Sequence, residues 1–189
     1  VVFTASTASP VPGDWAGIHF RDQTNDSLSK LEGCIIEYGG STAFNACVYL
    51  DNAHPVIQHN TIRNSLSAGL RCSGTGANNA DINCNNFKDN EYGIYTLNEA
   101  QPIIEDNNFL NNRTCGVHNA GTAQVNAQSN YWNDPAGPNQ SGDETYGNVD
   151  ASNYLDNEST CISAPPSNSP PFTPRTPSPA NGAVNVTLT

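Results

Sequence analysis

The chain has 189 residues, and its 18 acidic side chains against 7 basic ones give a formal net charge of -11 at pH 7. This charge repels the phosphates of nucleic acids and of anionic membranes, so we expect neither as a partner. No apolar run approaches the roughly 18 residues that a membrane-spanning helix needs, so we also predict no membrane insertion.

A short strand-like unit recurs along the chain, in which a small residue precedes an aliphatic one. The steps from position 48 to 70, from 70 to 94 and from 94 to 117 are 22, 24 and 23 residues. A period of about 23 residues without a helical stripe indicates a solenoid, whose coils bury their apolar faces only by stacking. The units are Gly17-Ile18, Cys47-Val48, Gly69-Leu70, Gly93-Ile94 and Gly116-Val117.

A second unit lies between copies of the first and reads aliphatic, two residues, Asn, one residue, large apolar, one residue, Asn or Asp. Its short alternating segments predict strands, so we expect an all-β fold, a parallel β-helix. A leucine-rich repeat has a comparable period but needs a leucine-dense core that this chain lacks. Clear copies are Ile57-Asn60-Ile62-Asn64, Ile82-Asn85-Phe87-Asp89 and Ile104-Asn107-Phe109-Asn111, and weaker ones are Leu31-Cys34-Ile36 and Ala127-Asn130-Trp132.

Stacked coils place equivalent residues in columns. We predict one inward column of Ile18, Val48, Leu70, Ile94 and Val117, and another of Ile36, Ile62, Phe87, Phe109 and Trp132. The Asn of the second unit is expected at a sharp bend, because Asn tolerates left-handed backbone geometry and its amide can bond the coils on either side. This asparagine ladder comprises Asn60, Asn85, Asn107 and Asn130, whereas Asn119 lies off it and should matter less.

These segments give the chain a resemblance to a known family over roughly residues 1–155. The segment PGDWAGI (12–18), the repeated coils, NYWNDPAGP (130–138) and GNVDASNYL (147–155) are similar to those of right-handed parallel β-helix proteins with the pectate-lyase-like fold. In bacterial and archaeal surface proteins of that family, similar segments close the last coil. The resemblance implies a right-handed helix but no single activity, because this fold hosts lyases, hydrolases, adhesins and structural proteins.

The composition divides the chain into three parts. We expect a β-helix domain over residues 1–163, a proline-rich connector over 164–180 and an isolated strand over 181–189. The final strand resembles the first strand of an immunoglobulin-like or fibronectin-type domain. The opening VVFTAS is similar to the middle of a coil, so we expect an upstream cap to be missing.

An outward column is the strongest candidate site. The residues that follow the inward aliphatic ones should point to solvent, one from each coil, at spacings of about 4.8 Å. This column could be a self-stacking ladder that stabilises the sheet, a surface for a glycan or partner protein, or a catalytic site. Its members are His19, Tyr49, Arg71, Tyr95 and His118.

Catalysis on this face would need further groups. Glycoside hydrolysis requires two carboxylates, whereas the repeat places only Asp51 here, beside Arg21 and Arg71. We therefore predict that the chain is not an enzyme and needs no cofactor. A calcium site in the closing segment is an alternative to solvated loop carboxylates there. Its candidate ligands are Asp143, Glu144 and Asp150, and histidines 19, 54, 59 and 118 lack metal-binding spacing.

Six cysteines without a CxxC pair favour disulfides over zinc or redox sites. We predict three intrachain bonds, with buried free thiols as the alternative. Disulfides imply an oxidising, extracellular or cell-surface setting. The proposed pairs are Cys34 with Cys47, Cys72 with Cys84, and Cys115 with Cys161.

These features together predict a non-catalytic extracellular module with a structural or adhesive role. An uncapped coil, a stiff connector and a final strand without a domain favour head-to-tail self-association into a filament, in which the C-terminal strand docks on a neighbour. The alternatives are that the tail folds back on its own coils, that the chain binds a glycan, or that it is a polysaccharide lyase or hydrolase.

Overall fold

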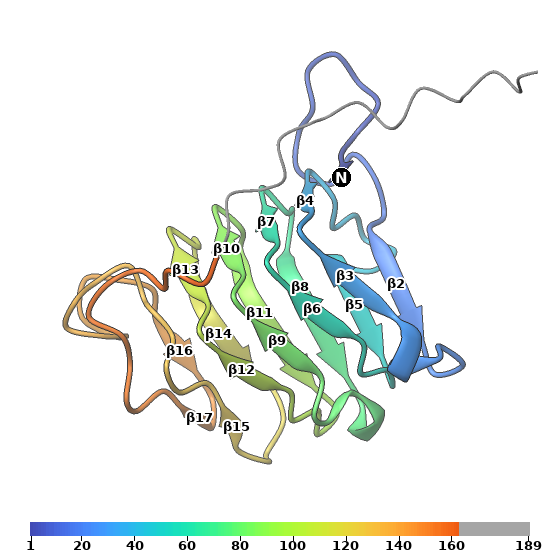
Figure 1. Ribbon diagram of the computed structural model, residues 1–189. Helices are drawn as coiled ribbons and strands as arrows, with labels where there is room; N and C mark the ends of the chain where they lie inside the picture. The colour runs from blue at the N-terminus through green and yellow to red at the C-terminus, as the bar shows by residue number, and fades with distance from the viewer. Residues whose placement is uncertain (163–189) are drawn as a thin grey trace, which may run out of the picture.

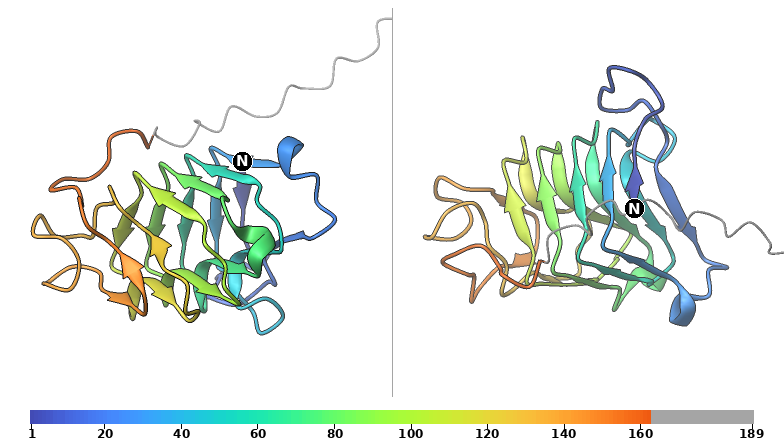
Figure 2. Two further views of the ribbon diagram at one scale, coloured as in Figure 1. Left: turned by 90° about the horizontal axis from the view of Figure 1, so that it is seen from below. Right: turned by 45° about the horizontal axis from the view of Figure 1, so that its top comes forward.

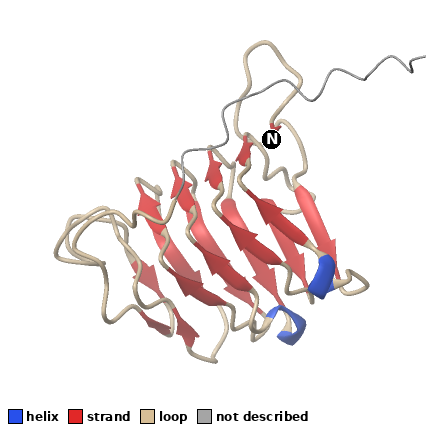
Figure 3. Ribbon diagram, in the orientation of Figure 1, coloured by secondary structure: helices blue, strands red, loops and turns tan. Residues whose placement is uncertain are grey.

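The structure, a computed structural model, describes residues 1–162. These residues form a β-solenoid of about five turns, built from three parallel sheets that run along its length (Figures 1 and 3). The all-β prediction and the parallel β-helix are therefore confirmed. The expected connector at 164–180 and the expected strand at 181–189 lie outside the described residues.

Each coil contributes one strand to each sheet, and neighbouring strands in every sheet are parallel. The long-strand sheet contains β2 (Ile18–Arg21), β5 (Ala46–Asp51), β8 (Ala68–Ser73), β11 (Tyr92–Leu97), β14 (Cys115–Asn119) and β16 (Thr145–Tyr146). The second sheet contains β3 (Lys30–Glu32), β6 (Val56–Gln58), β9 (Asp81–Asn83), β12 (Ile103–Glu105), β15 (Val125–Asn126) and β17 (Val149–Asp150). The third sheet contains β1 (Val2–Phe3), β4 (Ile35–Glu37), β7 (Thr61–Arg63), β10 (Asn86–Lys88) and β13 (Asn108–Leu110). Two 3-10 turns, η1 (Asp26–Leu28) and η2 (Thr75–Ala77), lie at corners between strands.

The predicted inward columns form a large part of the core. The strand register aligns Ile18, Val48, Leu70, Ile94 and Val117 in the long-strand sheet, and all but Ile18 are fully buried. In the third sheet the column ends in aromatic rings: the centroids of Phe87 and Phe109 are 5.5 Å apart, and those of Phe109 and Trp132 are 4.7 Å apart. The rings stack in the last coils because equivalent positions carry side chains of similar shape.

The aromatic column explains the glycines at the second position of three long strands, β8, β11 and β14. A Cβ atom on Gly93 would lie 2.5 Å from the carbonyl oxygen of Gly116 and 2.7 Å from Cδ1 of Phe109. A Cβ atom on Gly116 would lie 2.9 Å from the Trp132 ring. The small residue of the repeat is therefore required because the backbone passes directly over the rings.

The asparagine ladder is confirmed by its hydrogen bonds, at the bend between the second and third sheets. Each ladder side chain donates through Nδ2 at 2.8 Å to a backbone carbonyl of the preceding coil: Asn60 to Leu31, Asn85 to Ile57, Asn107 to Ile82 and Asn130 to Ile104. Each Oδ1 also accepts the backbone N–H of the ladder position in the preceding coil, at 2.8–3.0 Å. The buried amides thus satisfy backbone groups that no strand pairs with at the bend.

The ladder asparagines do not adopt the left-handed backbone conformation that we predicted for them. The left-handed backbone falls on the residue before each ladder position, with φ between 54° and 63° at Gly33, His59, Cys84, Asp106 and Ser129. That residue turns the chain, and the next side chain then points inward. Asn is required at the ladder position for its amide donor and acceptor rather than for its tolerance of positive φ.

A second ladder, which sequence reasoning missed, lies at the bend between the third and long-strand sheets. Its members are Ser65, Asn90, Asn112 and Asp143. The Nδ2 atoms of Asn90 and Asn112 donate to the carbonyls of Ile62 and Phe87 at 3.1 and 3.0 Å. The pairs Asn64-Ser65, Asp89-Asn90 and Asn111-Asn112, each with positive φ at its first residue, were the available signal.

The disulfide prediction is wrong in number and in pairing. One bond, Cys84–Cys161, joins residues 77 apart in sequence, and Cys34, Cys47, Cys72 and Cys115 are buried free thiols. The proposed partners lie on different sides of one coil, whereas Cys84 lies at a corner that the C-terminal segment reaches. Burial raises the pKa of the Cys47 thiol to about 11 and that of Cys115 to about 12, so both stay protonated.

The last described residues run back along this corner toward earlier coils, as the orange segment in Figures 1 and 2 shows. The N–H of Leu155 donates to the Asn130 carbonyl at 2.9 Å, and the N–H of Ser159 donates to Oδ1 of Asn108 at 2.7 Å. At the end of the segment, Nδ1 of His59 lies 3.1 Å from the Cys161 carbonyl. The disulfide therefore fastens a segment that crosses several coils.

We expect Asn107→Ala to lower the free energy of unfolding by roughly 1 to 3 kcal/mol, because it leaves buried groups of the neighbouring coils without partners. Chemical denaturation would measure this loss. Asn126→Ala is the matched control, because the Asn126 side chain in β15 is exposed. Equal losses for the two variants would contradict the ladder.

Asn119 is not a suitable control, contrary to the expectation from the sequence. Its side chain is 4% exposed and donates to the carbonyls of Ala123 and Asn148. Its Oδ1 also accepts from Oγ1 of Thr96 and the N–H of Gly121. It is a structural residue in its own right, and replacing it would leave these groups unpaired.

We expect alkylation of the denatured chain without reductant to add four labels, and alkylation after reduction to add six. Intact mass distinguishes the four free thiols from the two disulfide sulfurs of Cys84 and Cys161. No label before reduction would show three bonds and contradict the structure.

Candidate functional site: the outward column of the long-strand sheet

The register of the long-strand sheet places the predicted outward residues in one column. Adjacent strands align His19 with Tyr49, Tyr49 with Arg71, Arg71 with Tyr95, and Tyr95 with His118. The column has a further member that sequence reasoning missed, Tyr146 in β16, which aligns with His118. The signal was weak, because β16 follows a long loop and has only two residues.

The side chains of the column form two stacked groups. In the first, the rings of His19 and Tyr49 are parallel within 10° with centroids 4.8 Å apart, and Cζ of Arg71 lies 5.1 Å from the Tyr49 centroid. In the second, the rings of Tyr95 and His118 lie 4.7 Å apart, and the Tyr92 ring packs edge-on against both. Much of the column surface is therefore occupied by contacts within the column.

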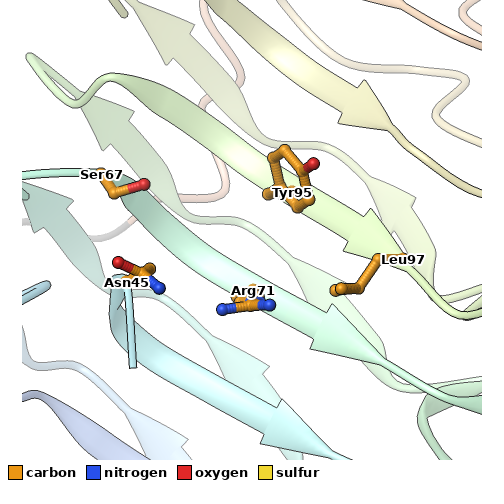
Figure 4. A pocket seen from close by; sticks show the side chains of 5 residues that line it. All are labelled: Asn45, Ser67, Arg71, Tyr95 and Leu97. Atoms are coloured by element: carbon orange, nitrogen blue, oxygen red, sulfur yellow. The ribbon is translucent and has the colours of Figure 1, made fainter. Parts of the chain in front are cut away.

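A hollow of about 250 Å³ lies where the two groups meet. Figure 4 shows Arg71 and Tyr95 on adjacent strands, with Asn45 and Ser67 toward the start of these strands and Leu97 toward their end. Nη1 of Arg71 donates to the Phe44 carbonyl at 3.2 Å, whereas its buried Nε has no hydrogen-bond partner among the described residues. The hollow thus offers one cationic donor, one aromatic face and small polar groups.

The electrostatics of the column involve Asp51, Arg71 and two histidines. Arg21 is the register partner of Asp51, and Oδ2 of Asp51 also lies 3.4 Å from Nε2 of His19. The Arg71 guanidinium donates to the Phe44 carbonyl. Burial lowers the pKa of His118, so its imidazole is neutral at pH 7.

The acidic residues of the closing segment do not converge on one point. Asp143 is 4% exposed and points into the solenoid, so its assignment as a solvated loop carboxylate is wrong. Asp150 instead accepts bonds from Ser152 and Gln128 at the surface, and the Ser152 bonds lower its pKa. Within residues 1–162 the structure contains no group of three or more His, Cys, Asp or Glu that could hold a metal ion.

No helix among the described residues is long and apolar enough to cross a membrane. No curated protein and no solved structure matches this chain. The family described as the right handed beta helix region matches residues 15–134, which is more than half of the chain. This match extends from Trp15 in the opening segment to Asp134 just after the last core ring, and thus covers the coils described above. The chain therefore belongs to the right-handed β-helix family.

Proposed function

We propose that this chain is a non-catalytic structural or adhesive module of an extracellular or cell-surface protein. The observation that carries this proposal is the self-stacked outward column. Its rings and its guanidinium group pack on one another, and Asp51 is engaged by His19. Side chains used in this way make the sheet face rigid and regular, as a scaffold or binding surface requires.

The arrangement of carboxylates supports a role without catalysis and without a cofactor. The column and the row beside it, which contains Arg21, Asp51, Ser73 and Leu97, include a single carboxylate. Acid–base hydrolysis of a glycosidic bond needs two carboxyl groups about 5 to 10 Å apart. Hydrolysis on this part of the face would therefore lack one of its two groups.

The disulfide supports an extracellular location. Cys84–Cys161 fastens the C-terminal segment to the corner of the solenoid, and such bonds persist in oxidising compartments. The net charge of -11 also keeps single molecules apart at low ionic strength, so that specific contacts decide association.

The open edge of the first coil supports self-association. Among residues 1–162, strands β1, β2 and β3 each pair on one side only, so in this part of the chain each sheet ends in backbone donors and acceptors without a strand partner. Val2 and Phe3 at this edge are 39% and 37% exposed. A parallel strand added here would satisfy the backbone groups and cover the apolar side chains. We propose that residues 181–189 of a second copy supply this strand.

Deletion of residues 164–189 tests this assembly. We expect the full-length chain to form head-to-tail oligomers whose mass grows with concentration, and the truncated chain to stay monomeric, as measured by multi-angle light scattering. A second variant, Phe3→Lys, places a charge at the edge and should also reduce assembly. If the full-length chain is monomeric at high concentration, the filament is disproved, and the tail either folds back in cis or acts as a linker.

The hollow beside Arg71 supports a second candidate function, binding of a glycan. A tyrosine face, a guanidinium and the amide of Asn45 are the groups that sugar rings contact through their apolar faces and hydroxyls. The unpaired Nε of Arg71 is the specific observation that favours this function, because a buried donor without a partner is costly.

A glycan array followed by calorimetry tests this candidate. If the hollow binds a glycan, Arg71→Ala should weaken binding at least tenfold, because the variant loses the charged donor. Arg113→Ala is the matched control, since it removes an exposed arginine paired with Glu91 elsewhere. Absence of binding to any glycan would exclude this function, and cleavage of an acidic polysaccharide would contradict the non-catalytic assignment.

A further inference from the structure

The second ladder ends in a residue that differs chemically from the others. Asn90 and Asn112 are followed at the equivalent position by Asp143, whose Oδ1 accepts the N–H of Asn112 at 2.9 Å. The Oδ1 atoms of Asn90 and Asn112 accept the backbone N–H groups of Ser65 and Asn90 in the same way. As an acceptor, the carboxyl group of Asp143 therefore replaces the amide of the other ladder residues.

The second oxygen of Asp143 occupies the place of a donor. In the ladder, the Nδ2 atoms of Asn90 and Asn112 donate to the carbonyls of Ile62 and Phe87. The register aligns Ile62 with Phe87 and Phe87 with Phe109, so the equivalent acceptor for Asp143 is the Phe109 carbonyl. Oδ2 of Asp143 is buried and has no hydrogen-bond partner among the described residues. A carboxylate oxygen cannot donate to a carbonyl, whereas a protonated carboxyl can.

We propose that in mildly acidic solution Asp143 is held as a neutral carboxylic acid in the folded chain and acts as a proton-dependent latch that fastens the closing segment, residues 133–150, to the last full coil. When it is protonated, the Asp143 carboxyl group supplies both a donor and an acceptor, as the ladder asparagines do. Without the proton, a negative charge is buried beside acceptor oxygens. The closing segment packs on the edge of the last full coil, so protonation of Asp143 controls how stably the segment is attached there.

The surroundings of Asp143 favour the neutral form. Burial is the largest cause that raises its pKa, to about 6, and the negative charge of Asp89 adds to it, whereas hydrogen bonds from Asn112 oppose it. The other ionisable groups nearby are Glu144 and the Cys115 thiol, whose own pKa is raised mainly by burial and further by the charges of Asp143 and Glu144. The nearby cations are engaged elsewhere, since Lys88 pairs with Asp89 and Arg113 with Glu91.

The direction of the pH effect follows from linkage. The pKa of Asp143 is about 6 in the folded chain, against an ordinary value of 3.8 for an aspartic acid side chain, which applies to the unfolded chain. Between these values the folded state holds more protons, so the stability that Asp143 contributes is fully present below the lower pKa and is lost as pH rises to the upper one. A pKa difference of one between the folded and unfolded chains changes the equilibrium constant for folding tenfold. The folding constant should therefore fall by up to ~100-fold as the pH rises across this window.

Comparison of the full chain with Asp143→Asn isolates this effect from other titrating groups. Asparagine supplies both the acceptor and the donor of a ladder rung at every pH. We expect the ratio of the folding constants, variant over wild type, to rise by up to ~100-fold between pH 4 and pH 7.5 in chemical denaturation. Asp150→Asn is the matched control, and its ratio should stay nearly constant over this range, because the pKa of Asp150 is lowered in the folded chain and its stabilising effect is lost only below the range.

Two readouts on the wild-type chain complete the test. The carbon resonance of the Asp143 carboxyl should titrate with a midpoint near 6, and a midpoint below about 4.5 would overturn the proposal. Hydrogen-exchange protection of the Asn112 and Asp143 amides, corrected for intrinsic rates, should fall from pH 5 to pH 7.5 more than that of the Asn60 amide in the first ladder. A flat or falling ratio for Asp143→Asn would also overturn it.

Discussion

The structure depends on satisfying backbone polar groups at the bends of the coil. Within the sheets every strand except those at the two ends pairs with strands of the coils before and after it, but at a bend the chain leaves this pattern inside the core. Buried amides solve the problem, because one side chain supplies a donor to one coil and an acceptor to another. Each coil is thus bonded to its neighbours at two corners as well as along three sheets.

This arrangement fixes the register and so determines the surface. Once the ladder residues are aligned, every inward aliphatic residue lies over its equivalent, and every outward residue joins a column about 4.8 Å from the next. The stacking of His19 on Tyr49 and of Tyr95 on His118 is a consequence of that alignment. The surface features that carry the proposed functions are therefore properties of the repeat, and the hollow beside Arg71 arises where two stacked groups meet.

The ends of the solenoid break the regularity, and the unusual chemistry lies there. At the closing end, the two-residue strands β16 and β17 and the loop before them replace a full coil, and Asp143 takes a position that Asn holds elsewhere. At the opening end, β1, β2 and β3 are the end strands of their sheets within residues 1–162. Proton binding at one end and strand addition at the other are thus two ways in which an otherwise rigid stack could respond to its surroundings.

The sequence by itself determined the repeat, the inward columns, the first ladder and the outward column, because each follows from a spacing of about 23 residues and needs no knowledge of turn geometry. Only the tertiary structure decided the disulfide, since the approach of Cys161 to Cys84 depends on a C-terminal segment that runs back across the coils. It also decided that Asp143 is buried and that Asp51 pairs with His19. These contacts join residues far apart in sequence or outside the repeat, where spacing carries no information and the packing of the coil end sets the distance.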